Sequence, residues 1–223
     1  MTSDHLTPRP PRKALVAELA LAGLLLAYGT FSVERLVLLL LLASQSLWIR
    51  RLGWADLGLR RPTSVRRTLL RAVGAALVVL AAVRVAIVPL AVWIAGEPVD
   101  LSALGEPGDA RTLLAWLAQA WTLAAFGEEM VFRGYLMRRI TDLVGDTRSG
   151  WTIALATSSI LFGLAHRYQG WAGVIATGVI GSLLGVLYLV GRRNLWNVIV
   201  CHAVVDTVAL LTIYSGHQSW LFG

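Results

Sequence analysis

The chain of 223 residues has one cysteine, Cys201, and only 15% of its residues are charged. A single cysteine excludes an internal disulfide and a metal cluster built from cysteines, and its position inside an apolar run predicts a packing role. The sequence also lacks an internal repeat and a matching pair of interrupted apolar segments. Both are typical of small transporters, so their absence argues against a transporter or channel, although Arg84 and Asp206 lie within apolar runs.

The scarcity of charge accompanies 57% hydrophobic residues and a mean hydropathy of +0.67. These values lie outside the range of soluble domains and predict an integral membrane protein. The formal net charge of +7 raises the alternative of nucleic-acid binding. However, the arginines form short clusters between apolar runs instead of lining one face, so we interpret them as determinants of membrane topology and expect no nucleic-acid partner.

Apolar runs near the length of a membrane-spanning helix predict an all-α, polytopic transmembrane bundle of about seven spans. The first run resembles a signal peptide in its basic flank and small-residue pair, but Glu18 interrupts it and longer runs follow, which favours a membrane helix. The sixth run holds Gly181 and Gly185, a spacing that permits close helix contact. The seven runs are 14–28, 36–49, 72–95, 112–140, 151–166, 171–190 and 195–214.

This pattern divides the chain into three parts: a cytoplasmic tail (1–13), N-terminal membrane helices (14–110) and a membrane core (111–223). A basic connection rich in Trp and Arg, 51–71, suits a lipid interface, and the acidic segment 97–109 is expected to be a loop. If the N-terminus lies inside, sixteen of the twenty basic residues fall in cytoplasmic segments. This positive-inside bias predicts a multi-pass protein of the bacterial cytoplasmic membrane, with the acidic loop outside.

Two adjacent carboxylates, Glu128 and Glu129, interrupt the fourth run. Ionisable groups inside a membrane segment are expensive and are treated as functional until shown otherwise. On a helix, residues four apart share a face and adjacent residues diverge. Glu129 is therefore expected to pair with Arg133, which leaves Glu128 free for proton transfer. A purely structural Glu129–Arg133 clamp is the alternative.

The same spacing occurs twice more. It places Phe162 over His166, and His202 over Asp206, where an imidazole and a carboxylate form either an oriented base or two ligands of a metal. Structural alternatives remain open: His166 as an interfacial residue, and His202 with Asp206 as a helix-packing hydrogen bond. Arg84 is expected to be buried and paired with an acid or a carbonyl.

The three stretches Glu128-Glu129-Met-Val-Phe-Arg133, Phe162-Gly-Leu-Ala-His166 and His202-Ala-Val-Val-Asp206 resemble the ordered motifs of the CAAX-protease and bacteriocin-processing family of intramembrane endopeptidases. The family motifs are Glu-Glu-x-x-x-Arg, Phe-x-x-x-His and His-x-x-x-Asn/Asp. The resemblance covers roughly residues 112–214, and residues 53–62 are similar to a linker common in bacterial members.

The resemblance implies that Glu128 and His166 activate a water molecule for attack on a peptide carbonyl. His202 and Asp206 would hold that water, stabilise the oxyanion or bind a metal. The tentative metal set is His166, His202 and Asp206, with Zn²⁺ as the candidate ion. Whether members of this family use a metal is left open, and Asp206 in place of the commoner Asn favours a cation.

The leading hypothesis is therefore an intramembrane endopeptidase that cuts a membrane-associated protein or peptide near the cytoplasmic side. The alternative from the same family is a non-enzymatic membrane adaptor or bacteriocin-immunity protein that keeps the motif residues as a buried polar network. The bilayer and a protein or peptide substrate are the expected partners, and nothing in the sequence indicates an oligomeric state.

Overall fold

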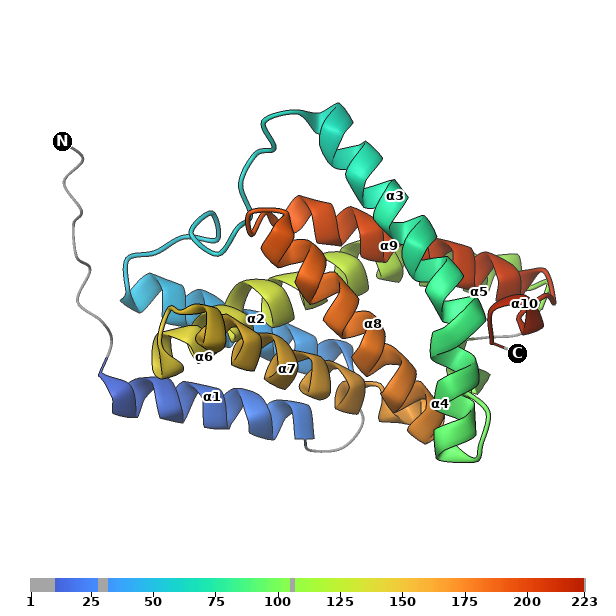
Figure 1. The fold of residues 1–223 in the computed structure, drawn as a ribbon, viewed down its shortest axis with the longest axis horizontal. Helices are drawn as coiled ribbons and strands as arrows, with labels where there is room; N and C mark the ends of the chain where they lie inside the picture. The colour runs from blue at the N-terminus through green and yellow to red at the C-terminus, as the bar shows by residue number, and fades with distance from the viewer. Residues whose placement is uncertain (1–10, 28–31, 105–106, 223) are drawn as a thin grey trace.

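A computed structural model describes residues 11–27, 32–104 and 107–222, and within these residues the chain is helical and contains no strand (Figure 1). The expected tail, apart from its last residues, and the end of the first apolar run at Tyr28 lie outside the described residues. The elements are α1 (Arg12–Ala27), α2 (Val33–Ile49), α3 (Val65–Ala82), η1 (Val83–Ile87), α4 (Val88–Ala95), η2 (Ser102–Leu104), α5 (Ala110–Gln119), η3 (Ala120–Glu128), η4 (Met130–Leu136), α6 (Met137–Val144), α7 (Arg148–Ala165), η5 (Arg167–Gln169), α8 (Gly170–Val190), α9 (Leu195–Tyr214) and α10 (Ser219–Phe222).

The all-α prediction is confirmed, and each predicted apolar run falls on helix. Among the described residues, three helical stretches are long and apolar enough to cross a membrane: Val65–Ala95, Arg167–Val190 and Leu195–Tyr214. The first of these joins α3, η1 and α4, while α5, η3, η4 and α6 run together through the Glu pair. Within the described residues, helices thus account for nearly all of the seven predicted runs, and three of the helical stretches meet the criteria for a membrane span.

The third helix begins about two turns earlier than expected. The sequence predicts a connection over 51–71, but α3 starts at Val65, where the Ser64 hydroxyl caps the helix by accepting a hydrogen bond from Arg67 N at 3.4 Å. Serine is a favoured N-cap because its side chain satisfies a free amide of the first turn. The prediction missed this start because the first turns of α3 are basic and so do not register as an apolar run.

The connection after α2 packs against the end of α8 and the turn between α8 and α9. Tyr188 donates a side-chain hydrogen bond to Leu57 O at 2.9 Å, and Leu195 N donates to Gly58 O at 2.9 Å. Gly58 has φ of 108°, and a Cβ there would lie 2.1 Å from Arg193 O. Glycine is thus required both by the backbone conformation and by the close approach.

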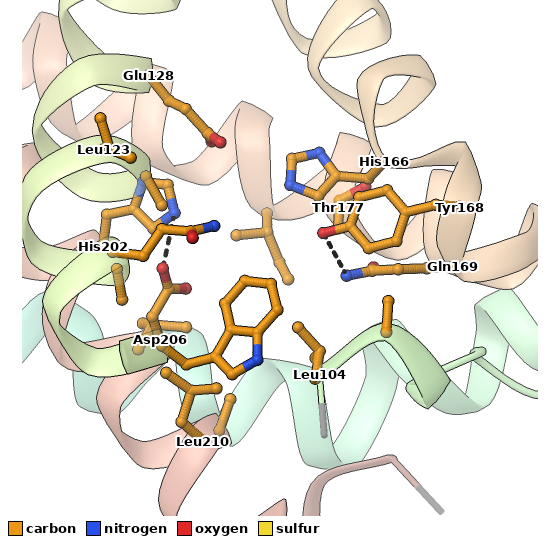
Figure 2. A pocket seen from close by; sticks show the side chains of 18 of the residues that line it. Leu104, Leu123, Glu128, His166, Tyr168, Gln169, Thr177, His202, Asp206 and Leu210 are labelled. Atoms are coloured by element: carbon orange, nitrogen blue, oxygen red, sulfur yellow. Dashed lines mark hydrogen bonds and ion pairs between the residues drawn. The ribbon is translucent and has the colours of Figure 1, made fainter. Parts of the chain in front are cut away.

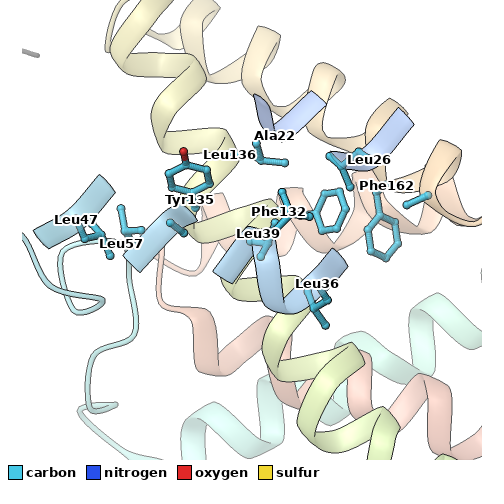
Figure 3. Packing of buried hydrophobic residues seen from close by; sticks show 13 residues of the cluster. Ala22, Leu26, Leu36, Leu39, Leu47, Leu57, Phe132, Tyr135, Leu136 and Phe162 are labelled. Atoms are coloured by element: carbon cyan, nitrogen blue, oxygen red, sulfur yellow. The ribbon is translucent and has the colours of Figure 1, made fainter. Parts of the chain in front are cut away.

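The N-terminal hairpin belongs to the same core as the helix that carries the Glu pair. In Figure 3, Ala22 and Leu26 of α1 and Leu36 and Leu39 of α2 surround Phe132 of η4. Glu18, midway along α1, accepts hydrogen bonds from Arg50 at 2.6 Å and from Ser46 at 2.9 Å. This pairing compensates for a charge inside an apolar helix. Residues from both sides of the expected division at residue 110 thus share one hydrophobic cluster.

Small residues let α7 and α8 pack closely, as the spacing of Gly181 and Gly185 predicts. A Cβ at Gly181 would lie 2.9 Å from Phe162 Cδ1, and one at Gly185 would lie 2.3 Å from Leu155 Cδ1. Gly163 on α7 faces Gly178 on α8, and a Cβ at Gly163 would lie 2.5 Å from Val174 O. These contacts bring Phe162 and His166 to the Glu pair.

The prediction that Arg84 is buried and paired is wrong. Arg84 is exposed on η1, while Val83 and Ile87 of the same segment are buried. The buried residues continue with Val88 and Ala91, so the core-facing side of this helix is set by its apolar residues and Arg84 points away from it. Arg84 therefore has no place in the candidate site.

Candidate active site

A π-helical stretch carries the two adjacent carboxylates. Residues 120–128 and 130–136 have π-helical hydrogen bonding, with Glu129 between the two segments. Single-turn π-bulges inside α-helices frequently occur at functional sites, and this stretch is longer than one turn. Gly127 makes room at its centre, because a Cβ there would lie 3.0 Å from Leu36 Cδ2 on α2. No pattern in the sequence predicts a π-helix.

Glu129 is the centre of a buried network that joins two helices. Its Oε1 accepts a hydrogen bond from Arg133 Nη1 at 2.8 Å and lies 2.8 Å from His202 Nδ1 on α9. Because a carboxylate only accepts, Nδ1 of His202 is the protonated nitrogen. The predicted pairing of Glu129 with Arg133 is confirmed. The contact to His202 was not predicted, since residues 73 positions apart give no spacing signal.

Arg133 is fixed on three sides and is 1% exposed. Besides Glu129, its Nη2 donates to the carbonyl oxygen of Gly181 at 2.9 Å, and its guanidinium carbon lies 4.4 Å from the centre of the Phe162 ring. A planar guanidinium can combine a carboxylate contact with stacking on an aromatic face. Arg133 therefore ties the Glu helix to both α7 and α8.

Glu128 points away from that network and into a cavity of about 590 Å³. Figure 2 shows its carboxylate directed toward the space between His166 and His202. Glu128 is 7% exposed, and its Oε2 is buried without a hydrogen-bond partner. Buried polar atoms are normally satisfied, so this oxygen is available to a water molecule or a ligand. The predicted divergence of the two carboxylates is confirmed.

His166 lies on the wall of the cavity opposite Glu128 (Figure 2). Its Nδ1 is 2.8 Å from the carbonyl oxygen of Phe162, which can only accept. Nδ1 therefore carries a proton, and in the neutral ring Nε2 is left as an acceptor. The centres of the Phe162 and His166 rings lie 4.7 Å apart and the rings are tilted by 49°, so the predicted placement of the two side chains on one helix face is confirmed.

His202 and Asp206 form the third side of the cavity. Nε2 of His202 lies 3.4 Å from Oδ2 of Asp206, as the spacing of four residues predicts, and this contact is an ion pair when the ring is protonated. His202 thus sits between two carboxylates, Glu129 on one ring nitrogen and Asp206 on the other. Such a pair fixes the orientation of the ring and favours its positive charge.

The side chains predicted as metal ligands do not form a three-ligand set. Among the described residues, no group of three or more His, Cys, Asp and Glu side chains is arranged to hold a metal ion. His202 has both ring nitrogens directed at carboxylates, and Nδ1 of His166 is held by a backbone carbonyl. The residues as arranged therefore do not fit a zinc centre built from His166, His202 and Asp206.

Two lining residues next to His166 were missed. Tyr168 and Gln169 of η5 line the cavity beside His166, and Gln169 Nε2 donates to the Tyr168 hydroxyl at 3.3 Å. They follow the second motif directly, but a Tyr-Gln pair has no spacing that marks it as part of a site. Apolar lining residues come from the loop after α4 and from α2, α3, η1, α5, η3, α7, α8, α9 and α10, and no local motif predicts that these elements converge.

The comparisons with known proteins match the part of the chain that holds the candidate site. Residues 110–208 match the model of the family described as type II CAAX prenyl endopeptidase Rce1-like, a stretch that contains all six candidate residues. The match confirms the resemblance inferred from the three motifs. Neither the search of curated proteins nor the search of solved structures found a match.

Proposed function

We propose that this chain, whose residues 110–208 belong to the Rce1-like family of CAAX endopeptidases, hydrolyses peptide bonds within the membrane with Glu128 as the general base. The family supports a CAAX-type membrane protease. The observation that carries the finer proposal is the buried, unpartnered Oε2 of Glu128 facing His166 across the cavity. A carboxylate that is neither paired nor solvated is free to take a proton from water.

The reaction follows from the residues around the cavity. A water molecule between Glu128 and His166 loses a proton to the Glu128 carboxylate while its oxygen bonds to the carbonyl carbon of the substrate. The positive charge of the protonated His202 ring, which Glu129 and Asp206 hold in place, stabilises the resulting oxyanion. The carbon–nitrogen bond then breaks, and the proton held by Glu128 passes to the leaving amine.

Glu129 and Arg133 have a positioning role in this proposal. Both are at most 1% exposed, so they cannot contact the substrate. Their contacts hold His202 and Phe162 in place around the cavity. Zn²⁺ enters none of these steps and stays a prediction that metal analysis tests.

We further propose that the remaining long helices also cross the bilayer, which gives seven spans. The C-terminal end of α4 lies next to the N-terminal end of α8, because Trp171 N donates to Glu97 Oε1 at 2.6 Å. The chain between these points must therefore cross the bundle once through the consecutive helical segments α5, η3, η4 and α6, and return through α7. Because α1 and α2 pack against these segments, they lie at the same depth in the bilayer.

The test compares two isosteric changes, one inside the cavity and one outside it. Glu128→Gln removes the base, whereas Glu97→Gln changes an exposed carboxylate that does not line the cavity. Purified protein in detergent is assayed against a peptide library, with products identified by mass. We expect cleavage by wild type and Glu97→Gln and no cleavage by Glu128→Gln. Full cleavage by Glu128→Gln refutes the mechanism, and a wild type that cuts nothing favours the adaptor or immunity alternative.

A further inference from the structure

The catalytic cavity opens at one end of the bundle. Its deep wall is formed by buried residues, among them Glu128, Leu184 and His202. The exposed residues in its lining come from the start of α2 and from the loop after α4: Val33, Glu34 and Ala103. A cavity whose exposed lining is confined to these segments is entered between them. Of the acidic loop, Leu101, Ala103 and Leu104 line the cavity.

The basic segments gather at the other end. Arg60 Nη2 donates to Arg192 O at 3.1 Å, which joins the connection after α2 to the turn after α8. The guanidinium of Arg193 lies 4.8 Å from the centre of the Trp151 ring at the start of α7. In Figure 1 the connection after α2, the α6–α7 turn and the α8–α9 turn lie toward the left, and α4, α5 and α10 lie toward the right.

Contacts of the acidic loop confirm that it belongs to the end with the cavity opening. Asp100 N donates to Gln169 O at 3.0 Å, at the start of α8, and Gly108 N donates to Tyr214 O at 2.8 Å, at the end of α9. Both acceptors lie at the helix ends remote from Arg192 and Arg193. The long helices thus separate a basic end from an acidic end that contains the opening.

Segments rich in Lys and Arg remain on the cytoplasmic side of a membrane. We propose that the cavity opens to the non-cytoplasmic side, and that its substrate is an apolar segment of an exported polypeptide or of the external part of a membrane protein. This inference rests on the proposed peptidase function and specifies the source of its substrate. It also replaces the expectation of cleavage near the cytoplasmic side. That expectation came from the sequence, which does not show where the cavity opens.

The chemistry of the lining restricts the substrate further. Glu34, Glu128 and Asp206 line the cavity, and its lining contains no Lys or Arg. The guanidinium of Arg133 is buried and bonded to Glu129. The other lining residues are mainly apolar side chains. Its three carboxylates outnumber the single cation of His202, so the cavity favours an apolar segment that is neutral or basic over an anionic one.

The side of the opening can be measured without any substrate. Ala103→Cys places a thiol at the opening, and Thr63→Cys places a matched exposed thiol at the basic end. Both are made in the full chain, in which native Cys201 is 0% exposed and gives the blank. Intact cells are treated with a membrane-impermeant maleimide, and the labelling is compared with that of lysed cells.

We expect Ala103→Cys to be labelled in intact cells and Thr63→Cys to be labelled only after lysis. Labelling of Thr63→Cys in intact cells, with or without Ala103→Cys, overturns the proposal, as does protection of Ala103→Cys until lysis. This outcome is independent of catalysis. Loss of cleavage by Glu128→Gln tests the peptidase function, so each proposal can fail while the other stands.

A second measurement links the opening to the reaction. A bulky maleimide adduct on Ala103→Cys would obstruct the opening, whereas the same adduct on Thr63→Cys would not. Peptide cleavage by the labelled purified proteins is compared with that of the unlabelled ones. We expect loss of cleavage for the adduct at position 103 and unchanged cleavage for the adduct at position 63. Equal rates for the two adducts would show that substrate enters elsewhere.

Discussion

Nδ1 of His202 lies 2.8 Å from Oε1 of Glu129, the oxygen that also binds Arg133. One carboxylate oxygen thus holds two cationic or potentially cationic groups from two helices, and the other oxygen, Oε2, is buried without a partner. The adjacent Glu128 takes no part in this hydrogen-bond network. The two neighbouring glutamates therefore have separate tasks, one in holding the site together and one inside the cavity.

Replacing the two glutamates should separate these tasks. Glu129→Ala leaves Arg133 buried without its partner, and breaking a buried ion pair in this way costs about 3–5 kcal/mol. Glu128→Gln removes a carboxylate whose Oε2 has no hydrogen-bond partner, so it should leave stability nearly unchanged. Thermal unfolding in detergent checks both. A Glu128→Gln variant as unstable as Glu129→Ala would mean that Glu128 is also structural.

The contact between α7 and α8 gives a second test, in two glycines that face each other. Gly163→Ala would place its Cβ 2.5 Å from Val174 O, whereas Gly178→Ala would place its Cβ 3.6 Å from Ser159 O, an ordinary contact. We expect Gly163→Ala to destabilise the protein by about 1–3 kcal/mol, as overpacking does. Gly178→Ala should have a much smaller effect. Equal midpoints of thermal unfolding would contradict the close packing.

Sequence patterns predicted the contacts of the site that lie within one helix and missed the contacts between helices. The pairs Glu129–Arg133, Phe162–His166 and His202–Asp206 each lie within one helical turn, and helix periodicity alone predicts them. The contact between Glu129 and His202 depends on how distant helices pack, which no spacing encodes.

The fold shows the same division. The apolar runs predict the helices, but the π-helical stretch and the early start of α3 depend on hydrogen bonds and capping that hydropathy does not measure. Arg84 was misplaced for a related reason. An arginine in an apolar run was expected to be buried with a partner. Instead, Val83 and Ile87 lie on the side of the helix that packs against the core, and Arg84 lies on the exposed side.

Metal removal tests the chemistry that the residues can support. His166, His202 and Asp206 do not form a three-ligand set with other described side chains, so we expect chelation to leave peptide cleavage unchanged. Purified protein is dialysed against a strong zinc chelator, and both the cleavage rate and the metal content are measured. Loss of cleavage that returns on adding Zn²⁺ would show that the site rearranges around a metal, and Glu128 would then act on metal-bound water.

The turn between α6 and α7 predicts a pH-dependent contribution to stability. A hydrogen bond from Trp151 Nε1 at 2.7 Å, with help from Arg138, lowers the pKa of Asp146 below its ordinary value of 3.8. A lowered folded-state pKa stabilises the protein above the unfolded-state pKa, and this stability disappears as pH falls through the folded-state pKa. Asp146→Asn should thus unfold at a slightly lower temperature than wild type at pH 7.

The Asp146→Asn difference should vanish at pH values well below 3.8. The effect is small because the Asp146 side chain is 46% exposed and exposed ion pairs contribute little. Thermal unfolding of both proteins across this pH range checks the prediction. A difference that persists unchanged in acid would mean that the asparagine disturbs the turn by another route than loss of charge.

The charge of the cavity predicts which peptides are cut fastest. Glu34, Glu128 and Asp206 line it without a lysine or arginine, so an aspartate next to the cleaved bond meets like charge in a poorly solvated space. For matched apolar peptides that carry Lys or Asp beside the cleaved bond, we expect kcat/KM to favour the Lys peptide by about tenfold or more, which corresponds to about 1.4 kcal/mol. Glu34→Gln should narrow that ratio, since it removes one rim carboxylate without touching Glu128. A preference for the Asp peptide would mean that Arg133 or another cation reaches the substrate, contrary to the burial of Arg133 and its bond to Glu129.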